Sequence, residues 1–319
     1  MDYGYIFRRA FEITWRFKFL WIFGILGGGS YGSSFGGGPN SSFDPSMFES
    51  GNRTRPRSSA GAESVEHFFN SIDPGIIIAV FLLLVPLFIA LLVIGIIFRG
   101  ALIGSIADIE AGRAAGLGAG WRRGVRCFWR LLGQGLLVFA VILAVAIPVI
   151  ILVVALTAGV AIATLGIGLI ILIPLLILGI LLLIPIFIGL TIVLEYAQRE
   201  IVIRDQRIIA SLRTGYWLLR RNLGPSLLVW LITVGIGLGV GIVFLVGLLI
   251  AALPGIAVGL AAGLLPGIIV GVALGIPILV VLAGATGTLL STLWNLGWEQ
   301  VARRDWSRMN PQPVPTAST

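Results

Sequence analysis

The chain has 319 residues, of which 58% are hydrophobic and only 11% are charged, and its formal net charge is +8. An average soluble domain is about 25% charged, so a chain this long with so few charges cannot cover a surface that faces water. The composition therefore excludes a soluble enzyme, a disordered chain and a nucleic-acid-binding domain. It predicts an all-α, polytopic membrane protein, because a helix satisfies its backbone polar groups within one segment of chain.

The first unit, residues 1–98, contains two predicted spans of unequal quality. Trp15 to Gly29 provides about 15 apolar residues, or roughly 22 Å of helix, against a hydrocarbon core of ~30 Å. We still expect this segment to span, because the basic segment that follows the second span would otherwise face outside. A Gly/Ser-rich outer loop, residues 28–73, leads to Pro74–Phe98, which is long enough for one clear span.

The second unit, residues 99–195, begins with a basic amphipathic helix, 113–130, and continues with 64 uncharged residues from Leu131 to Leu194. Since one span needs about 20 residues, this run holds at least two spans, the third and the fourth. We place the turn between them at 157–166, where Thr and Gly interrupt the apolar sequence.

The third unit, residues 196–299, has the same plan. A basic amphipathic helix, 204–222, precedes 77 uncharged residues, Asn222–Trp298, which hold the fifth and sixth spans. We expect the turn between these spans near 254–266; because this connector is itself apolar, a re-entrant segment is the alternative. Residues 300–319 form a polar tail.

The distribution of charge predicts the orientation. Both ends of each long uncharged run are basic, and positive charge marks the cytoplasmic side, so each run crosses an even number of times. Of the 22 Lys and Arg residues, 19 lie on the predicted cytoplasmic side, whereas the outer loop carries a net charge of −2. We therefore expect about six transmembrane helices in a bacterial inner membrane, with the N- and C-termini in the cytoplasm.

An internal repeat relates the two basic helices. A shift of 91 residues places 119–139 over 210–230 with nine of 21 positions identical, among them two Arg and two Gly, which shared apolar composition does not readily supply. Ile6–Leu26 resembles these two segments more weakly and is interpreted as a third copy of the repeat. The sequence thus predicts parallel repeats, each a basic interfacial helix followed by a two-span hairpin, unlike the inverted repeats of many alternating-access transporters.

The basic helices are predicted to lie at the membrane surface. Aromatic rings favour the headgroup level, and a juxtamembrane Arg contributes about 1 kcal/mol near anionic lipid. This favours an interfacial anchor over a specific headgroup or nucleotide site, and it leaves nucleic acid as a poor partner. The expected lipid-interface residues are Trp121, Arg122, Arg123, Arg126, Trp129, Arg130, Arg213, Tyr216, Trp217, Arg220 and Arg221.

Six glycines at four-residue spacing predict a glycine zipper, because small residues let helix backbones approach closely. Packing within the chain is favoured over a homo-oligomer interface, and a pore lining is the weakest alternative. The expected helix-packing residues are Gly255, Gly259, Gly263, Gly267, Gly271 and Gly275.

The residues that usually carry chemistry are scarce. One Cys, Cys127, and one His, His67, cannot form a disulfide or a dedicated Cys/His zinc site. The neighbouring carboxylates at 108–110 and 195–205 lie beside arginines, which favours interfacial salt bridges over acid–base catalysis. We therefore expect no enzyme activity, no catalytic residue, no cofactor and no metal.

Two segments resemble a known group of proteins. Arg9–Gly24 resembles the opening of uncharacterised bacterial multi-span proteins. Glu195–Asn222 is similar to the segment after the fourth span in the membrane domain attached to some glycerophosphodiester phosphodiesterases. The hydrolytic barrel of those enzymes, with its His and Glu residues, has no counterpart here, so the resemblance implies a membrane domain and carries over no catalytic residue.

Together these patterns predict a non-catalytic integral inner-membrane protein that organises lipid or a partner protein through basic interfacial helices and Gly-rich packing faces. The expected partners are membrane lipids, mainly anionic, with a protein partner or a second copy of the chain as further possibilities. The alternative is a facilitator or transporter of lipid or a small solute. It would have to work without ionisable groups inside the spans, which are the usual mark of proton relays and ion pathways.

Overall fold

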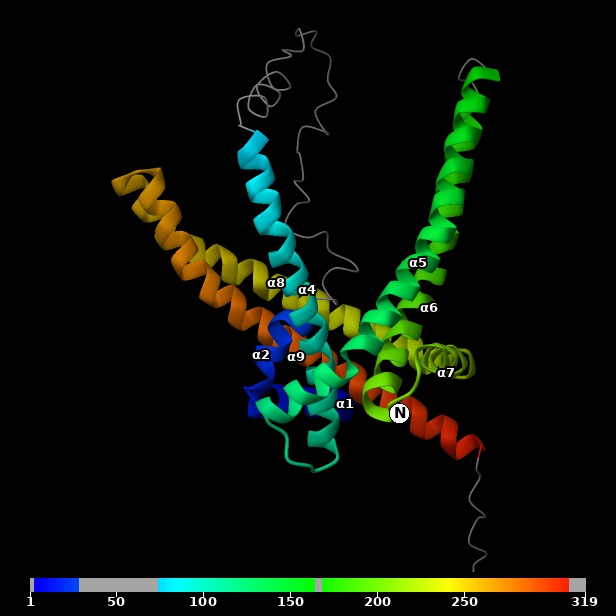
Figure 1. The fold of residues 1–319 in the computed structure, drawn as a ribbon, viewed down its shortest axis with the longest axis horizontal. Helices are drawn as coiled ribbons and strands as arrows, with labels where there is room; N and C mark the ends of the chain where they lie inside the picture. The colour runs from blue at the N-terminus through cyan, green and yellow to red at the C-terminus, as the bar shows by residue number, and fades with distance from the viewer. Residues whose placement is uncertain (1–2, 29–73, 164–167, 310–319) are drawn as a thin grey trace, which may run out of the picture. The chain divides into compact units, whose positions relative to one another are not determined.

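The computed structural model describes residues 3–28, 74–163 and 168–309. Within these ranges the chain forms eight α-helices and no strand (Figure 1). The helices are α1 (Tyr3–Arg16), α2 (Leu20–Gly27), α4 (Pro74–Glu110), α5 (Leu117–Ala163), α6 (Leu169–Arg204), α7 (Ile208–Arg221), α8 (Leu223–Ala262) and α9 (Leu264–Met309).

Five of the described helices, α4, α5, α6, α8 and α9, are long and apolar enough to cross a membrane. Each of them contains at least one internal proline and continues past it, which membrane helices tolerate better than soluble ones. The chain is therefore an all-α, multi-pass membrane protein, and this prediction is confirmed.

The first predicted span differs from the structure. Where the sequence predicts one helix from Trp15 to Gly29, α1 ends at Arg16 and α2 covers only eight residues. Eight helical residues measure about 12 Å, which is too short to cross a ~30 Å core. The described residues thus contain five candidate spans instead of six. Almost all of the predicted outer loop, 28–73, lies outside the described ranges, as does the end of the polar tail.

The chain divides into two compact units, and the smaller one is residues 30–95. The structure describes this unit from Pro74, as the first part of α4. Its side chains there are exposed and apolar, including Phe81, Leu82 and Phe88 at 67–72% exposure. A helix with this surface requires lipid or another apolar partner around it.

The larger unit, residues 1–29 and 96–319, contains two helical hairpins. In each hairpin two long helices lie side by side, α5 with α6 and α8 with α9 (Figure 1). We call the outer parts of these hairpins the arms, 135–163 with 169–187 and 234–262 with 264–283. Most described side chains on the arms are exposed Leu, Ile and Val, so the arms are the parts of this unit suited to hydrocarbon.

The remaining parts of the larger unit pack together and bury polar as well as apolar side chains. We call this region the base; it consists of α1, α2, α7 and the segments 96–110, 117–134, 188–204, 223–233 and 284–309. Its centre is α9, in which every residue from Leu290 to Trp298 is buried. A helix buried on all sides is a core element, so the inner part of α9 organises the base.

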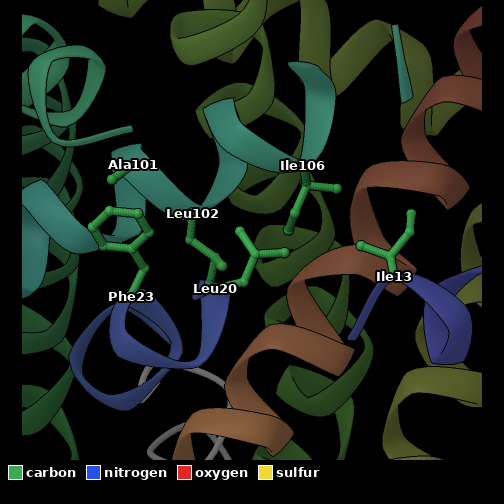
Figure 2. Close-up of a cluster of buried hydrophobic side chains, with 6 residues drawn as sticks. All are labelled: Ile13, Leu20, Phe23, Ala101, Leu102 and Ile106. Carbon is green, nitrogen blue, oxygen red and sulfur yellow. The ribbon is translucent and has the colours of Figure 1, made fainter. Parts of the chain in front are cut away.

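The N-terminal helices close one side of the base. Figure 2 shows Ile13 of α1 and Leu20 and Phe23 of α2 directed toward the inner end of α4. Leu20 meets Leu102 there, and both side chains are fully buried. Burying side chains of this size stabilises by about 1.5–3 kcal/mol each, which explains why α2 is apolar although it is too short to span.

Glycines allow α2 to contact α9 backbone to backbone. A Cβ atom added to Gly24 would lie 2.2 Å from the carbonyl oxygen of Gly284, and one added to Gly287 would lie 2.3 Å from that of Gly24. Real Cβ atoms do not approach so closely. Only glycine therefore fits at this crossing.

The two basic helices dock in the same way. A Cβ on Gly124 of α5 would lie 2.2 Å from the carbonyl oxygen of Ile97 in α4, and one on Gly215 of α7 would lie 2.8 Å from that of Val193 in α6. The predicted 91-residue alignment places Gly124 over Gly215. Matching contacts are what a parallel repeat requires, and the repeat itself stays a prediction.

The glycine series lies at the tip of the α8–α9 hairpin. The turn falls at Gly263, whose φ of +99° favours glycine, and it lies inside the predicted 254–266. Gly255 and Gly267 face the opposite helix; a Cβ on Gly255 would lie 2.8 Å from the Cα of Gly271. The series therefore folds back on itself, whereas Gly275 has no described atom within 4 Å of an added Cβ. The other turn predicted, 157–166, lies partly within α5, and residues 164–167 are outside the described ranges.

Candidate functional site

The exposed face of α1 carries an aromatic ridge. Phe7, Phe11 and Trp15 follow one another at four-residue spacing and are each about half exposed. Residues at this spacing lie one above the other on a helix. The rings of Phe11 and Trp15 are in contact, with centroids 5.8 Å apart. The ring of Trp15 also contacts that of Trp21 in α2, with centroids 5.4 Å apart.

Charged residues form a second ridge beside these aromatic rings. Arg8, Glu12 and Arg16 are each one position further along the helix and exposed. Arg9 connects the helix to α4, since its Nε donates to Glu110 at 2.9 Å. Hydrogen bonds to Glu12 and Glu110 raise the pKa of Arg9 further above its already high ordinary value, so this guanidinium remains charged.

The first turns of α5 repeat this arrangement. Trp121, Val125 and Trp129 form an exposed ridge, in which Trp129 is 75% exposed. Arg122 and Arg126 lie one position further along and are also exposed. Among the residues that the structure describes, no carboxylate forms an ion pair with either of these two arginines.

Arg123 and Arg130 of the same helix pair with neighbouring segments of the base, although Arg130 remains the more exposed of the two. Arg123 Nη1 donates to Asp108 at 2.7 Å and to the carbonyl oxygen of Gly104 at 3.2 Å. Arg130 Nη1 donates to the backbone carbonyl of Asp205 at 2.9 Å and also contacts its carboxylate. The predicted interface set therefore divides into outward-facing arginines and arginines that hold neighbouring helices together.

The third basic helix, α7, has buried residues on one face, including Gly215 and Leu218. Its other face exposes all five predicted interface residues, Arg213, Tyr216, Trp217, Arg220 and Arg221. The guanidinium groups of Arg220 and Arg221 lie over the ring of Trp217, at 5.5 and 5.6 Å from its centroid. Cation–π contacts of this kind favour a charged surface that also accommodates apolar groups.

A cleft of about 500 Å³ lies between α7 and the ends of α6 and α9. Three arginines from two helices line it, and two tryptophans contribute their rings. Its lining residues are Glu200, Arg204, Arg213, Thr214, Trp217, Leu218, Arg221, Ala302, Asp305 and Trp306.

Ion pairs position two of the three arginines in the cleft. Arg204 Nη1 lies 3.1 and 3.3 Å from the two oxygens of Glu200, and its guanidinium lies 5.1 Å from the ring of Trp298. Arg221 lies 3.6 Å from Asp305. No described carboxylate pairs with Arg213. The lining side chains therefore carry one more positive than negative charge.

A buried ion network lies between α4 and α6 in the base. Glu195 accepts from Arg99 Nη2 and from Arg199 Nη1, both at 2.7 Å. Arg199 is fully buried and lies over the ring of Trp294 at 5.7 Å. The predicted pairing of carboxylates with nearby arginines is confirmed at Glu195–Arg199, at Glu200–Arg204 and at Asp108–Arg113.

Sequence reasoning missed several of these residues. The aromatic residues at positions 7, 11 and 15 are visible in the sequence, but their spacing alone does not show that this face of α1 is exposed. The sequence around Arg99 does not indicate its ion pair, because its partner Glu195 is 96 positions away. Arg204, Asp305 and Trp306 come together only because α6 and α9 end beside α7. In the described part of the chain, no group of three His, Cys, Asp or Glu residues is placed to hold a metal.

A protein-family model matches residues 8–296 of the chain. The chain belongs to this family of unknown function (DUF7544). The DUF7544 match covers the exposed ridge of α5, all of α7 and most of the base. Phe7 of the α1 ridge and Ala302, Asp305 and Trp306 of the cleft lie outside it. No curated protein and no solved structure matches the chain. Membership of a family of unknown function assigns no activity to this chain. The resemblance to phosphodiesterase membrane domains stays a prediction.

Proposed function

We propose that this multi-pass membrane protein is non-catalytic and gathers anionic lipid around its base, in a bacterial inner membrane with both termini in the cytoplasm. The observation that carries the proposal is the exposed surface of α5, where Arg122 and Arg126 lie beside Trp121 and Trp129. These arginines form no ion pair with a described carboxylate.

The aromatic and basic side chains of this surface suit different parts of the headgroup layer. Indole rings favour the headgroup level, where one edge of the ring is apolar and the N–H remains hydrated. Guanidinium groups beside them face the phosphate layer, and each contributes about 1 kcal/mol near an anionic surface. α1 likewise carries charged residues beside its aromatic ridge, and α7 exposes basic and aromatic residues together, which supports a lipid role for the whole base.

Replacing both arginines tests the proposal. We expect R122Q/R126Q to lower the preference of the purified full chain for phosphatidylglycerol over phosphatidylcholine by roughly tenfold, since about 2 kcal/mol of attraction is lost and part of it is screened by salt. Lipids retained from a mixed bilayer can be counted by native mass spectrometry.

R122K/R126K is the matched control, because it keeps both charges at the same positions and should retain most of the preference. Arg123 is left intact, since it pairs with Asp108 within the base. An unchanged lipid preference in R122Q/R126Q would refute the proposal.

A further inference from the structure

We infer that the cleft between α7 and the ends of α6 and α9 binds one phosphodiester headgroup of an anionic phospholipid. This inference rests on the proposed function and deepens it, because it assigns one specific site within a surface that otherwise attracts lipid by charge alone. It differs from the α5 ridges in being concave: its volume of about 500 Å³ lies in the range of small-molecule sites.

The charge of the cleft selects the ligand class. Arg204, Arg213 and Arg221 contribute three positive charges, and Glu200 and Asp305 contribute two negative ones. A single net positive charge matches a phosphodiester, which is a monoanion, better than a phosphate monoester, which approaches two negative charges near neutral pH. Guanidinium groups also suit phosphate because they form paired hydrogen bonds to its oxygens.

The arginines on the walls of the cleft are held in place before a ligand arrives. Arg204 lies between Glu200 and the ring of Trp298, and both of its contacts to Glu200 use Nη1. Its Nε and Nη2 groups are therefore not occupied by this carboxylate. Arg221 lies between Asp305 and the ring of Trp217. Groups ordered in advance lose less conformational entropy when they bind.

Arg213 is the arginine whose charge is not balanced within the described residues, and we assign it the direct contact to the phosphate. Its neighbours suit the rest of a lipid headgroup. Trp217 and Trp306 are 41% and 66% exposed at the cleft, and such rings pack against the glycerol and the first methylenes while their N–H edges stay hydrated.

The position of the cleft along the chain favours a lipid over a soluble molecule. The uncharged sequence ends at Leu194 in α6 and at Trp298 in α9. The cleft residues of these helices follow within about three turns, or roughly 15 Å. The exposed aromatic residues Tyr216 and Trp217 beside the cleft indicate the headgroup level, where such rings gather.

The test is a titration of the purified full chain in detergent with phosphatidylglycerol, with bound lipid measured by native mass spectrometry. R213Q should weaken the tightest binding event about tenfold. R207Q is the matched control: Arg207 directly precedes α7, is exposed and loses the same charge, but does not line the cleft. Its affinity should stay within about twofold of the unaltered chain.

A competition experiment with a water-soluble phosphodiester distinguishes a lipid headgroup from a soluble ligand. Glycerophosphoglycerol, which has the same headgroup without acyl chains, should compete only at concentrations at least 100-fold higher. Competition at equal concentration would overturn the lipid assignment. Equal affinities for R213Q and R207Q would overturn the site itself.

The outcome for the cleft is independent of the outcome for the proposed function. If R213Q has no effect while R122Q/R126Q still lowers the phosphatidylglycerol preference, the cleft inference fails and the proposed function stands. Arg213 is exposed on the surface of α7, and an unchanged thermal unfolding midpoint for R213Q would show that lost binding does not come from lost folding.

Discussion

At the scale of single residues, Glu195 joins two arginines from two helices. Its two carboxylate oxygens lie 2.7 Å from Arg99 on α4 and 2.7 Å from Arg199 on α6, and all three side chains are largely buried. Replacing both partners of such a pair with apolar groups is often harmless, whereas removing one partner leaves a charge buried without compensation. The carboxylate is therefore the sensitive member of this network.

We expect Glu195→Ala to lower the free energy of unfolding by about 3–5 kcal/mol, because two guanidinium groups in the base lose their shared carboxylate. Unfolding of the purified protein in increasing fractions of a denaturing detergent measures the change. Glu299→Ala is the control, since its ion pair with Arg303 is exposed and should contribute less than about 1 kcal/mol. Equal losses in the two variants would contradict the role given to Glu195.

Adjacent residues also show where sequence reasoning stops. The composition of 113–130 predicts a separate basic amphipathic helix, whereas in the structure the helix begins at Leu117 and continues into the following apolar segment as α5. Arg122 and Arg123 differ by 100° around its axis. Arg122 faces outward, and Arg123 pairs with Asp108. Which arginine belongs to which face depends on where α4 packs, and no single-helix pattern contains that information.

At the scale of elements, α2 is the clearest departure from prediction. Its sequence is wholly apolar, which suggested part of a span, but the helix is short and packs against α9 and the inner end of α4. Hydropathy cannot separate a segment buried in protein from one buried in lipid. The five long helices were predictable because their uncharged runs exceed any buried helix of ordinary length.

The crossing of α2 and α9 should tolerate no side chain on its contact face. We expect Gly24→Ala to detach α2 and lower the thermal unfolding midpoint by several degrees, because the new Cβ would lie 2.2 Å from the backbone oxygen of Gly284. Gly235→Ala on α8 is the control, since an added Cβ there has no described atom within 4 Å and Ala is the better helix former. Similar midpoints for the two variants would rule out a backbone contact at Gly24.

At the scale of the whole molecule, the base gathers elements from both ends of the chain. α1 packs against α9, and the last turns of α9 contact α7 through Asp305 and Arg221. Both described ends of the chain therefore belong to one compact unit; the placement of the two termini on the cytoplasmic side stays a prediction. The number of crossings was less predictable, because the predicted first span, Trp15–Gly29, is short and α2 covers only eight of its residues.

The topology can be tested by labelling single cysteines with a membrane-impermeant reagent, in a chain whose own Cys127 is replaced by Ser. Glu12→Cys and Arg303→Cys, both exposed in the base, should react only when the cytoplasmic side is opened, because basic segments stay inside. Leu260→Cys, 86% exposed beside the α8–α9 turn, should react from the opposite side, as should Ser58→Cys in the predicted outer loop. Labelling of positions 12 and 303 from different sides would contradict the shared base. Labelling of position 58 from the same side as position 12 would instead show that the chain does not cross the membrane between these two positions, so that α1 and α2 pack in the base without forming a span.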